Sequence, residues 1–403
     1  MPLVFVHGVA NRVDREHVEE TDVRRAMFAR YVTRSWSREG GGPATIRQPY
    51  WGSSGASLAW GGASVPHRDH AAESFGGDTG GEPLAEIVAG LVPDGARPRE
   101  RLIATARQSM ADAVDLLLAA ALLSAPGQAD ALAAVSVAAL SSVRADPSPD
   151  WLAEVADDEA FAVRLCNILD AAAERTPSRE EFGGGGTRAA VMGAVSRLRS
   201  SAVAAAGAPV AERVRSWLMP PLTVFLGDVL VYLRQRTETG ERGFGVKIGE
   251  EIQQASAERG PRDPFVLVAH SMGGNIVYDL LSGPLRDAGV TVDLLVTVGS
   301  QVAFFEELSL FSPHPADVPG IAAQRLPMPP PVRRWVNVYD LNDVLSFRAA
   351  PVFEGVEDYS FRSGRVRAHS AYFLMASFYA RLAERLGPLQ YGQQASASER
   401  KAR

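Results

Sequence analysis

The stretch Phe265-Val-Leu-Val-Ala-His270-Ser271-Met272-Gly273-Gly274 decides the fold of this chain. Its first half is a continuous apolar run, which predicts a buried parallel strand over 264–269. A serine and two glycines follow, and the apolar spacing over 273–281 then predicts a helix. A buried strand that turns sharply into a helix through a serine is the context of a nucleophile elbow, in which the serine Oγ stands clear of the strand end.

The residues around Ser271 fit such a turn. Small side chains at Ala269 and Gly273 let the strand and the helix approach closely, although the familiar pattern has glycine where Ala269 stands. The backbone N–H of Met272 is expected at the start of the helix, where it can face a developing oxyanion. His270 and Gly273 are expected to support the turn without taking part in the chemistry.

A serine at such an elbow needs a base and an acid, which follow it in the order Ser, Asp or Glu, His. Only two histidines lie downstream, and His314 falls in a proline-rich segment before the next predicted strand. His369, just before a closing helix predicted over 370–386, is therefore the expected base. The acid is expected after a strand predicted over 332–339, where Asp343 is favoured and Asp340 remains the alternative.

The start of the chain predicts a second part of the site. Residues 2–6 form a short apolar run, which predicts a buried strand that ends at His7-Gly8. The loop after it is expected to supply the second oxyanion donor, the N–H of Val9. Gly8 would permit close backbone approach, and His7 would shape the loop.

Strands predicted at 2–6, 44–51, 264–269, 291–298 and 332–339 alternate with helices, which indicates an α/β fold with a mostly parallel sheet covered on both faces. A core is therefore expected over 1–51 and 222–386. Residues 52–221 interrupt this pattern with a long loop and helices predicted at 99–123, 128–143, 148–174 and 187–215. We expect this helical insertion to act as a cap or lid, or as a docking surface. The polar end, 387–403, is predicted to be disordered.

Composition narrows the function classes. Among 403 residues the net charge is −6 and no basic block occurs, which disfavours nucleic-acid binding. Cys166 is the single cysteine, so neither an intrachain disulfide nor a cysteine zinc site can form. The N-terminus has no signal-peptide pattern, and the best membrane-span candidate, 217–233, is short and contains two prolines. We therefore expect a cytoplasmic protein, with membrane or protein contacts, if any, made peripherally through the insertion.

Taken together, Val4-Phe-Val-His7-Gly8, Ala269–Gly274, Asp343-Val344 and His369 resemble the α/β-hydrolase superfamily in its lipase and serine-esterase branches, and in particular its bacterial members. The resemblance covers 1–51 and about 222–386, and leaves out the helical middle. It implies an α/β-hydrolase fold and hydrolysis of a small-molecule or lipid carboxylic ester through an acyl-enzyme. Ser271 would be the nucleophile, with no cofactor and no metal.

Two alternatives stay open at this point. The same triad would serve an acyltransferase or a thioesterase, because only the acyl acceptor or the leaving group differs. A catalytically silent interaction module, binding partners through its Ala- and Leu-rich helices, is the alternative from another class.

Overall fold

The computed structural model describes most of the chain. The described residues are 2–8, 15–36, 44–52, 55–56, 88, 91–93, 95–173, 185–200, 226–236, 244–261, 263–311, 325–361, 369 and 372–387.

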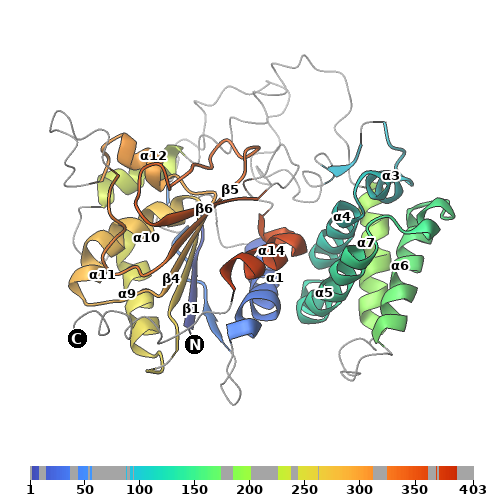
Figure 1. The fold of residues 1–403 in the computed structure, drawn as a ribbon, viewed down its shortest axis with the longest axis horizontal. Helices are drawn as coiled ribbons and strands as arrows, with labels where there is room; N and C mark the ends of the chain where they lie inside the picture. The colour runs from blue at the N-terminus through green and yellow to red at the C-terminus, as the bar shows by residue number, and fades with distance from the viewer. Residues whose placement is uncertain are drawn as a thin grey trace, which may run out of the picture.

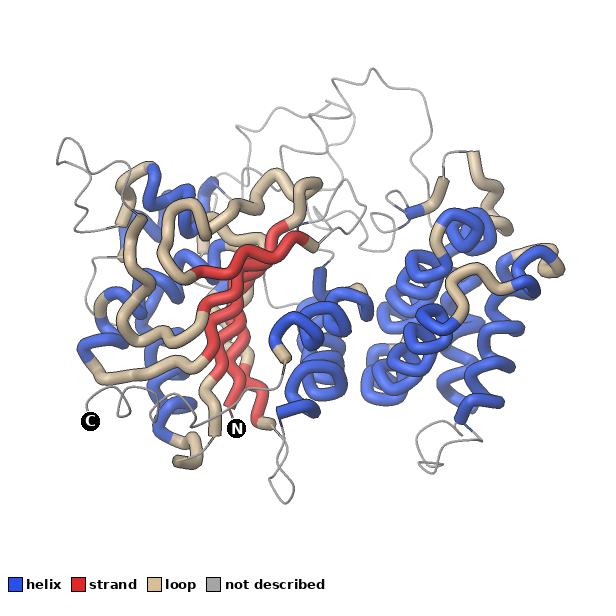
Figure 2. Tube along the Cα trace, in the orientation of Figure 1, coloured by secondary structure: helices blue, strands red, loops and turns tan. Residues whose placement is uncertain are grey.

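Six strands form one all-parallel sheet, which confirms the predicted α/β class (Figures 1 and 2). In chain order they are β1 (Pro2–Val6), β2 (Thr45–Arg47), β3 (Val266–His270), β4 (Leu294–Val298), β5 (Trp335–Tyr339) and β6 (Val356–Ser360). Their order across the sheet is β2-β1-β3-β4-β5-β6. β1 and β4 are buried along their whole length, because parallel strands covered on both faces read as continuous apolar runs.

The strand that carries the serine motif lies inside the sheet. Leu3 of β1 pairs with Val266 of β3, and Val266 pairs in turn with Leu294 of β4. Because all strands are parallel, the loops that follow β1, β3 and β4 emerge at the same edge of the sheet. The topology therefore brings residues from three distant parts of the chain around the end of β3.

Side chains of each strand alternate between two apolar cores. Leu3 and Phe5 contribute to the core shared with one layer of helices, and Val4 and Val6 to the core on the opposite face. The first layer comprises α1 (Arg15–Met27), η1 (Phe28–Val32), η2 (Thr33–Trp36), η7 (Tyr372–Leu374) and α14 (Ala376–Leu386). The second comprises the helical residues 226–235 with α9 (Phe244–Ala257), α10 (Met272–Ser282), α11 (Pro284–Asp287) and α12 (Val302–Glu307).

The described helices of the insertion form a bundle beside α1 and α14, on the side away from the sheet (Figure 1). They are α3 (Arg101–Gln108), α4 (Met110–Ser124), η4 (Pro126–Gln128), α5 (Ala129–Ala145), η5 (Asp150–Ala153), α6 (Asp158–Ala173) and α7 (Gly185–Ser200). The apolar helix α4 lies in the middle of the bundle and is buried along most of its length. One continuous core joins the bundle to α1, α14 and the sheet.

Polar contacts also fix the bundle to the layer that covers the sheet. Buried Asp115 of α4 accepts the Ser377 N–H at 3.2 Å and also the Ser377 hydroxyl, at the start of α14. The hydroxyls of Tyr31 and Ser136 lie 2.6 Å apart. The bundle is therefore attached through α4 to the start of α14 and through α5 to η1. The remainder of the predicted insertion, including residues 57–87 and 201–221, lies outside the described residues.

Two predicted helices are wrong in detail. The helix expected over 99–123 is divided at Ser109, whose backbone is extended and whose Oγ accepts the Asp112 N–H at 3.2 Å, so that it caps α4. The helix expected over 148–174 begins instead as the short turn η5, and α6 starts only at Asp158. At both places a side chain caps the start of the following helix: Ser109 caps α4, and the Asp157 Oδ1 accepts the Ala160 N–H at 2.8 Å in the first turn of α6.

The strand β6 was not predicted, because its sequence VEDYS has no continuous apolar run. It is an edge strand with partly exposed residues, paired only to β5. Among the described residues no helix is long and apolar enough to cross a membrane. Except for Gly387, the tail expected to be disordered lies outside the described residues.

Candidate active site

Ser271 lies on the tight turn between β3 and α10. Its backbone has φ 54° and ψ −129°, a left-handed conformation that costs a non-glycine residue about 1–3 kcal/mol. Hydrogen bonds on both sides hold this conformation: the Ser271 N–H donates to the Val298 carbonyl, and the Ser271 carbonyl accepts the Gly274 N–H, each at 2.9 Å. The neighbouring strand and the new helix thus fix where the Oγ points.

Close backbone packing around this turn explains two of the glycines. A Cβ on Gly273 would lie 2.5 Å from the Val6 carbonyl oxygen and 2.6 Å from that of His7. These are backbone atoms, which cannot move aside as a flexible side chain can. A Cβ on Gly8 would lie 2.7 Å from the Cβ of Ser271. The loop after β1 therefore passes directly beside the serine, and close backbone approach was expected from the sequence at Gly8.

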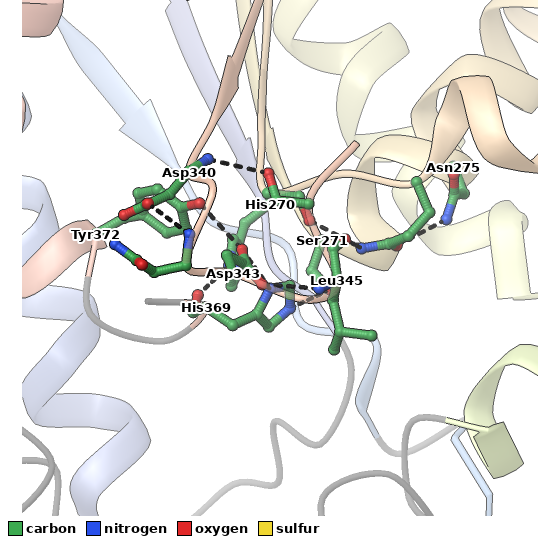
Figure 3. A network of polar contacts seen from close by, with 12 residues as sticks. His270, Ser271, Asn275, Asp340, Asp343, Leu345, His369 and Tyr372 are labelled. Carbon is green, nitrogen blue, oxygen red and sulfur yellow. Dashed lines mark hydrogen bonds and ion pairs between the residues drawn. The ribbon is translucent and has the colours of Figure 1, made fainter. Parts of the chain in front are cut away.

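Ser271, His369 and Asp343 form one hydrogen-bonded line (Figure 3). The Nε2 of His369 lies 2.7 Å from the Ser271 Oγ. The Nδ1 of His369 lies 2.9 Å and 3.0 Å from the two carboxylate oxygens of Asp343. A carboxylate only accepts, so Nδ1–H donates to Asp343 and leaves the Nε2 lone pair facing the serine hydroxyl. The structure thus brings together the three residues expected to be catalytic.

The Asp343 carboxylate is the buried end of this line. Its side chain has 0% exposure, whereas the His369 side chain is 24% exposed. Asp343 Oδ1 also accepts the Leu345 N–H at 3.0 Å, and Oδ2 accepts the Tyr372 hydroxyl at 3.0 Å. Burial, followed by the nearby Asp343 charge, raises the pKa of Tyr372 well above its ordinary value, so the phenol keeps its proton and donates.

Asp340, the alternative acid, has a different role. Its Oδ1 accepts the N–H of Asn342 at 2.9 Å, two residues further on, which is an Asx turn. The Asp343 N–H in turn donates to the Asp340 carbonyl at 3.1 Å. Asp340 thus shapes the loop that carries Asp343, and Asp343 contacts His369.

A polar ladder across the sheet fixes the far end of the Asp343 loop. The Asn337 side chain of β5 accepts the Thr297 hydroxyl at 2.8 Å and donates to the Phe347 carbonyl at 3.0 Å. The Phe347 N–H donates to the Ser300 carbonyl at 3.1 Å. Both ends of the loop are therefore tied to the sheet, which limits how far the carboxylate can move.

His7 shapes the loop after β1. Its Nδ1–H donates to the Gly8 carbonyl at 2.8 Å, and its Nε2 accepts the Trp51 N–H at 3.2 Å. The His7 ring also stacks on the Trp51 ring, with centroids 5.0 Å apart and planes 3° from parallel. Both ring nitrogens are occupied in the neutral form, so His7 is placed as a structural residue and not as a base.

Of the two expected oxyanion donors, the N–H groups of Met272 and Val9, only that of Met272 lies within the described residues. Met272 is the first residue of α10, and the first N–H groups of a helix have no partner within that helix. Val9, the other expected donor, lies outside the described residues, although Gly8 before it lies beside Ser271. Among the described residues no group of three or more His, Cys, Asp or Glu side chains could hold a metal ion.

Two residues next to the site escaped the sequence analysis. Tyr372 donates to Asp343, and its only sequence signal is its place three residues after His369. Gln301 ties two segments of the site together, because its side-chain amide donates to the Gly299 carbonyl at 2.8 Å and to the Leu345 carbonyl. Both residues reach their partners only once the chain has folded, and neither belongs to the serine motif.

Comparison of the chain with protein-family models, with curated proteins and with solved structures finds no significant match in any of the three.

Proposed function

We propose that this chain is a serine esterase with an α/β-hydrolase fold, which cleaves small-molecule or lipid carboxylic esters through an acyl-enzyme. The observation that carries the proposal is the unbroken line from the Ser271 Oγ through His369 to Asp343, with the serine on a strained turn. A strained backbone held by surrounding hydrogen bonds is typical of functional sites.

The topology supports the α/β-hydrolase assignment. Ser271 follows β3, Asp343 follows β5, and His369 follows β6, so the three residues occur in the chain order of that fold. All three emerge at the carboxyl edge of a parallel sheet, where open α/β sheets bind their ligands. The sharp strand–serine–helix turn at Ser271 is the third supporting feature.

The geometry supports a specific mechanism. Ser271 Oγ attacks the ester carbonyl carbon while its proton passes to Nε2 of His369, 2.7 Å away. The Asp343 carboxylate stabilises the imidazolium and holds its Nδ1–H. The Met272 N–H, with a donor from the loop after Gly8, stabilises the oxyanion. One such donor lowers the activation free energy by about 3–4 kcal/mol. His369 then protonates the leaving alcohol, and water releases the acid by the same steps.

Hydrolysis of p-nitrophenyl esters of increasing chain length tests the proposal. Wild-type protein should hydrolyse at least one of these esters. Ser271→Ala should lower kcat by several powers of ten, because loss of a triad nucleophile has that effect in other serine hydrolases. Circular dichroism and thermal unfolding of both proteins control for folding. Equal rates for the two folded proteins would refute the proposal.

A further inference from the structure

His270, the last residue of β3, contacts the main chain of His369 (Figure 3). Its Nε2 lies 2.8 Å from the His369 carbonyl oxygen. A carbonyl oxygen only accepts, so Nε2 of His270 carries the proton and donates it. The ring centroids of His270 and His369 lie 4.9 Å apart. The His270 ring also packs edge-on against Phe373, with ring centroids 5.3 Å apart.

This contact differs in kind from the other contacts of His369. The bonds of the His369 ring to Ser271 and Asp343 change during the proposed reaction, because Nε2 gains a proton and the serine Oγ becomes acylated. The bond between the His270 N–H and the His369 carbonyl involves neither the transferred proton nor the acyl group. It can therefore persist through every step.

We propose that His270 is a positioning residue for the base, and that its Nε2–H fixes the main chain of His369 relative to the nucleophile. This inference rests on the proposed function. His270 is covalently adjacent to Ser271, so the strand end that places the serine also places the donor that holds the base. The Nε2–H bond of His270 thus adds a main-chain constraint on His369 to those that its ring makes with Ser271 and Asp343.

The surroundings of His270 keep it in the donating form. Burial, and next the proximity of His369, hold the pKa of His270 well below its ordinary value. The neutral ring carries a single proton, which Nε2 uses toward His369. Its Nδ1 faces the loop after β1, since a Cβ on Gly8 would lie 3.3 Å from this atom. The ring therefore lies between the Gly8 loop and the segment that carries His369.

Two substitutions separate the donor from the packing. His270→Phe keeps an aromatic ring against Phe373 and removes the N–H, whereas His270→Gln places an amide N–H near the position of Nε2. We expect His270→Phe to lower kcat about 10- to 100-fold with KM changed less than about threefold, because a misplaced catalytic group costs rate more than binding. His270→Gln should recover most of the lost kcat. A His270→Phe enzyme with wild-type kcat, or a His270→Gln enzyme equally impaired, would overturn the proposal.

A measurement on the wild-type protein keeps the inference testable if a variant fails to fold. Long-range proton–nitrogen NMR of the histidine rings at pH 7 reports which nitrogen of His270 is protonated. We expect a proton on Nε2 and none on Nδ1, and the opposite tautomer would overturn the inference. A wild-type protein that hydrolyses no ester overturns the proposed function, whereas an active one with unchanged kcat in His270→Phe overturns only the role of His270.

Discussion

Replacing each of the two aspartates in the loop after β5 by asparagine gives a matched pair of perturbations. Asp343 accepts three hydrogen bonds, from the His369 ring, the Tyr372 hydroxyl and the Leu345 N–H. Asparagine has one accepting oxygen and an NH₂ group that only donates. The amide oxygen is needed in the place of Oδ1, because the Leu345 N–H there can only donate, whereas the Tyr372 hydroxyl beside Oδ2 can also accept.

The outcome for His369 follows from the positions of these donors. If the NH₂ takes the place of Oδ2, it faces the Tyr372 hydroxyl and the Nδ1 of His369, and the imidazole must move its proton to Nε2. That tautomer cannot accept the proton of Ser271. The corresponding change in a protease triad lowers kcat about 10⁴-fold, or about 5.4 kcal/mol of activation free energy at 1.36 kcal/mol per factor of ten. We expect a similar loss for Asp343→Asn.

Asp340→Asn is the control, because an asparagine oxygen can accept the Asn342 N–H and keep the Asx turn. We expect kcat within about threefold of wild type, because the turn that shapes the Asp343 loop is kept. Steady-state kinetics on the same p-nitrophenyl ester, with thermal unfolding of both variants, compares the pair. A folded Asp343→Asn enzyme that keeps more activity than Asp340→Asn would refute the assignment of the acid.

Three further predictions concern residues around the line. Tyr372→Phe removes the hydroxyl donor to Asp343 and should lower the free energy of unfolding by about 1.5–3 kcal/mol, as measured by urea titration. Its loss of kcat should be smaller than that of Asp343→Asn. A Tyr372→Phe protein with unchanged stability would contradict a stabilising role for this hydrogen bond. The folded-state pKa of His270 lies below its ordinary value of 6.5, so the unfolded chain binds the extra proton and stability falls as pH drops below 6.5. Between pH 7 and 5.5 the wild type should lose more stability than His270→Gln, and equal losses would contradict the burial of a neutral ring. Asp115→Ala should lower the free energy of unfolding by about 3 kcal/mol, because the Ser377 N–H and hydroxyl both lose their acceptor, and a double-mutant cycle with Ser377→Ala that shows no coupling would contradict this.

The part of the site encoded next to the nucleophile could be predicted from the sequence. The apolar run before Ser271, the small residues around it and the following glycines all act within a few residues of one another. The positive φ of Ser271 is the structural counterpart of that pattern, whereas the close approach of Gly273 to β1 was not expected. The parallel sheet was predictable for the same reason, since each buried strand is a separate apolar run.

Asp343 and His369, far from Ser271 in the sequence, were expected from their order along the chain, but other features that depend on contacts between distant segments were not predicted. β6 contains the charged residues Glu357 and Asp358, which are typical of a loop. In the structure, Asp358 Oδ1 accepts the side-chain N–H of Asn337 and the backbone N–H of Ala349, at 2.9 Å each. Tyr372 looks like an ordinary core aromatic until the fold places its hydroxyl against Asp343. The break at Ser109 has a local cause, a side-chain cap three residues before Asp112, within a segment whose apolar spacing favours a continuous helix. Such polar contacts leave no periodic trace in the sequence.

The reactivity of one hydroxyl tests the central claim most directly. A fluorophosphonate probe reacts with a serine only when a base and an oxyanion site activate it. After incubation with the wild-type protein, mass spectrometry of the digested chain should find the phosphonyl group on Ser271 alone, and Ser271→Ala should remain unlabelled under the same conditions. A folded wild-type protein that stays unlabelled, or that carries the label on another residue, would contradict the proposal that Ser271, His369 and Asp343 form a working catalytic triad.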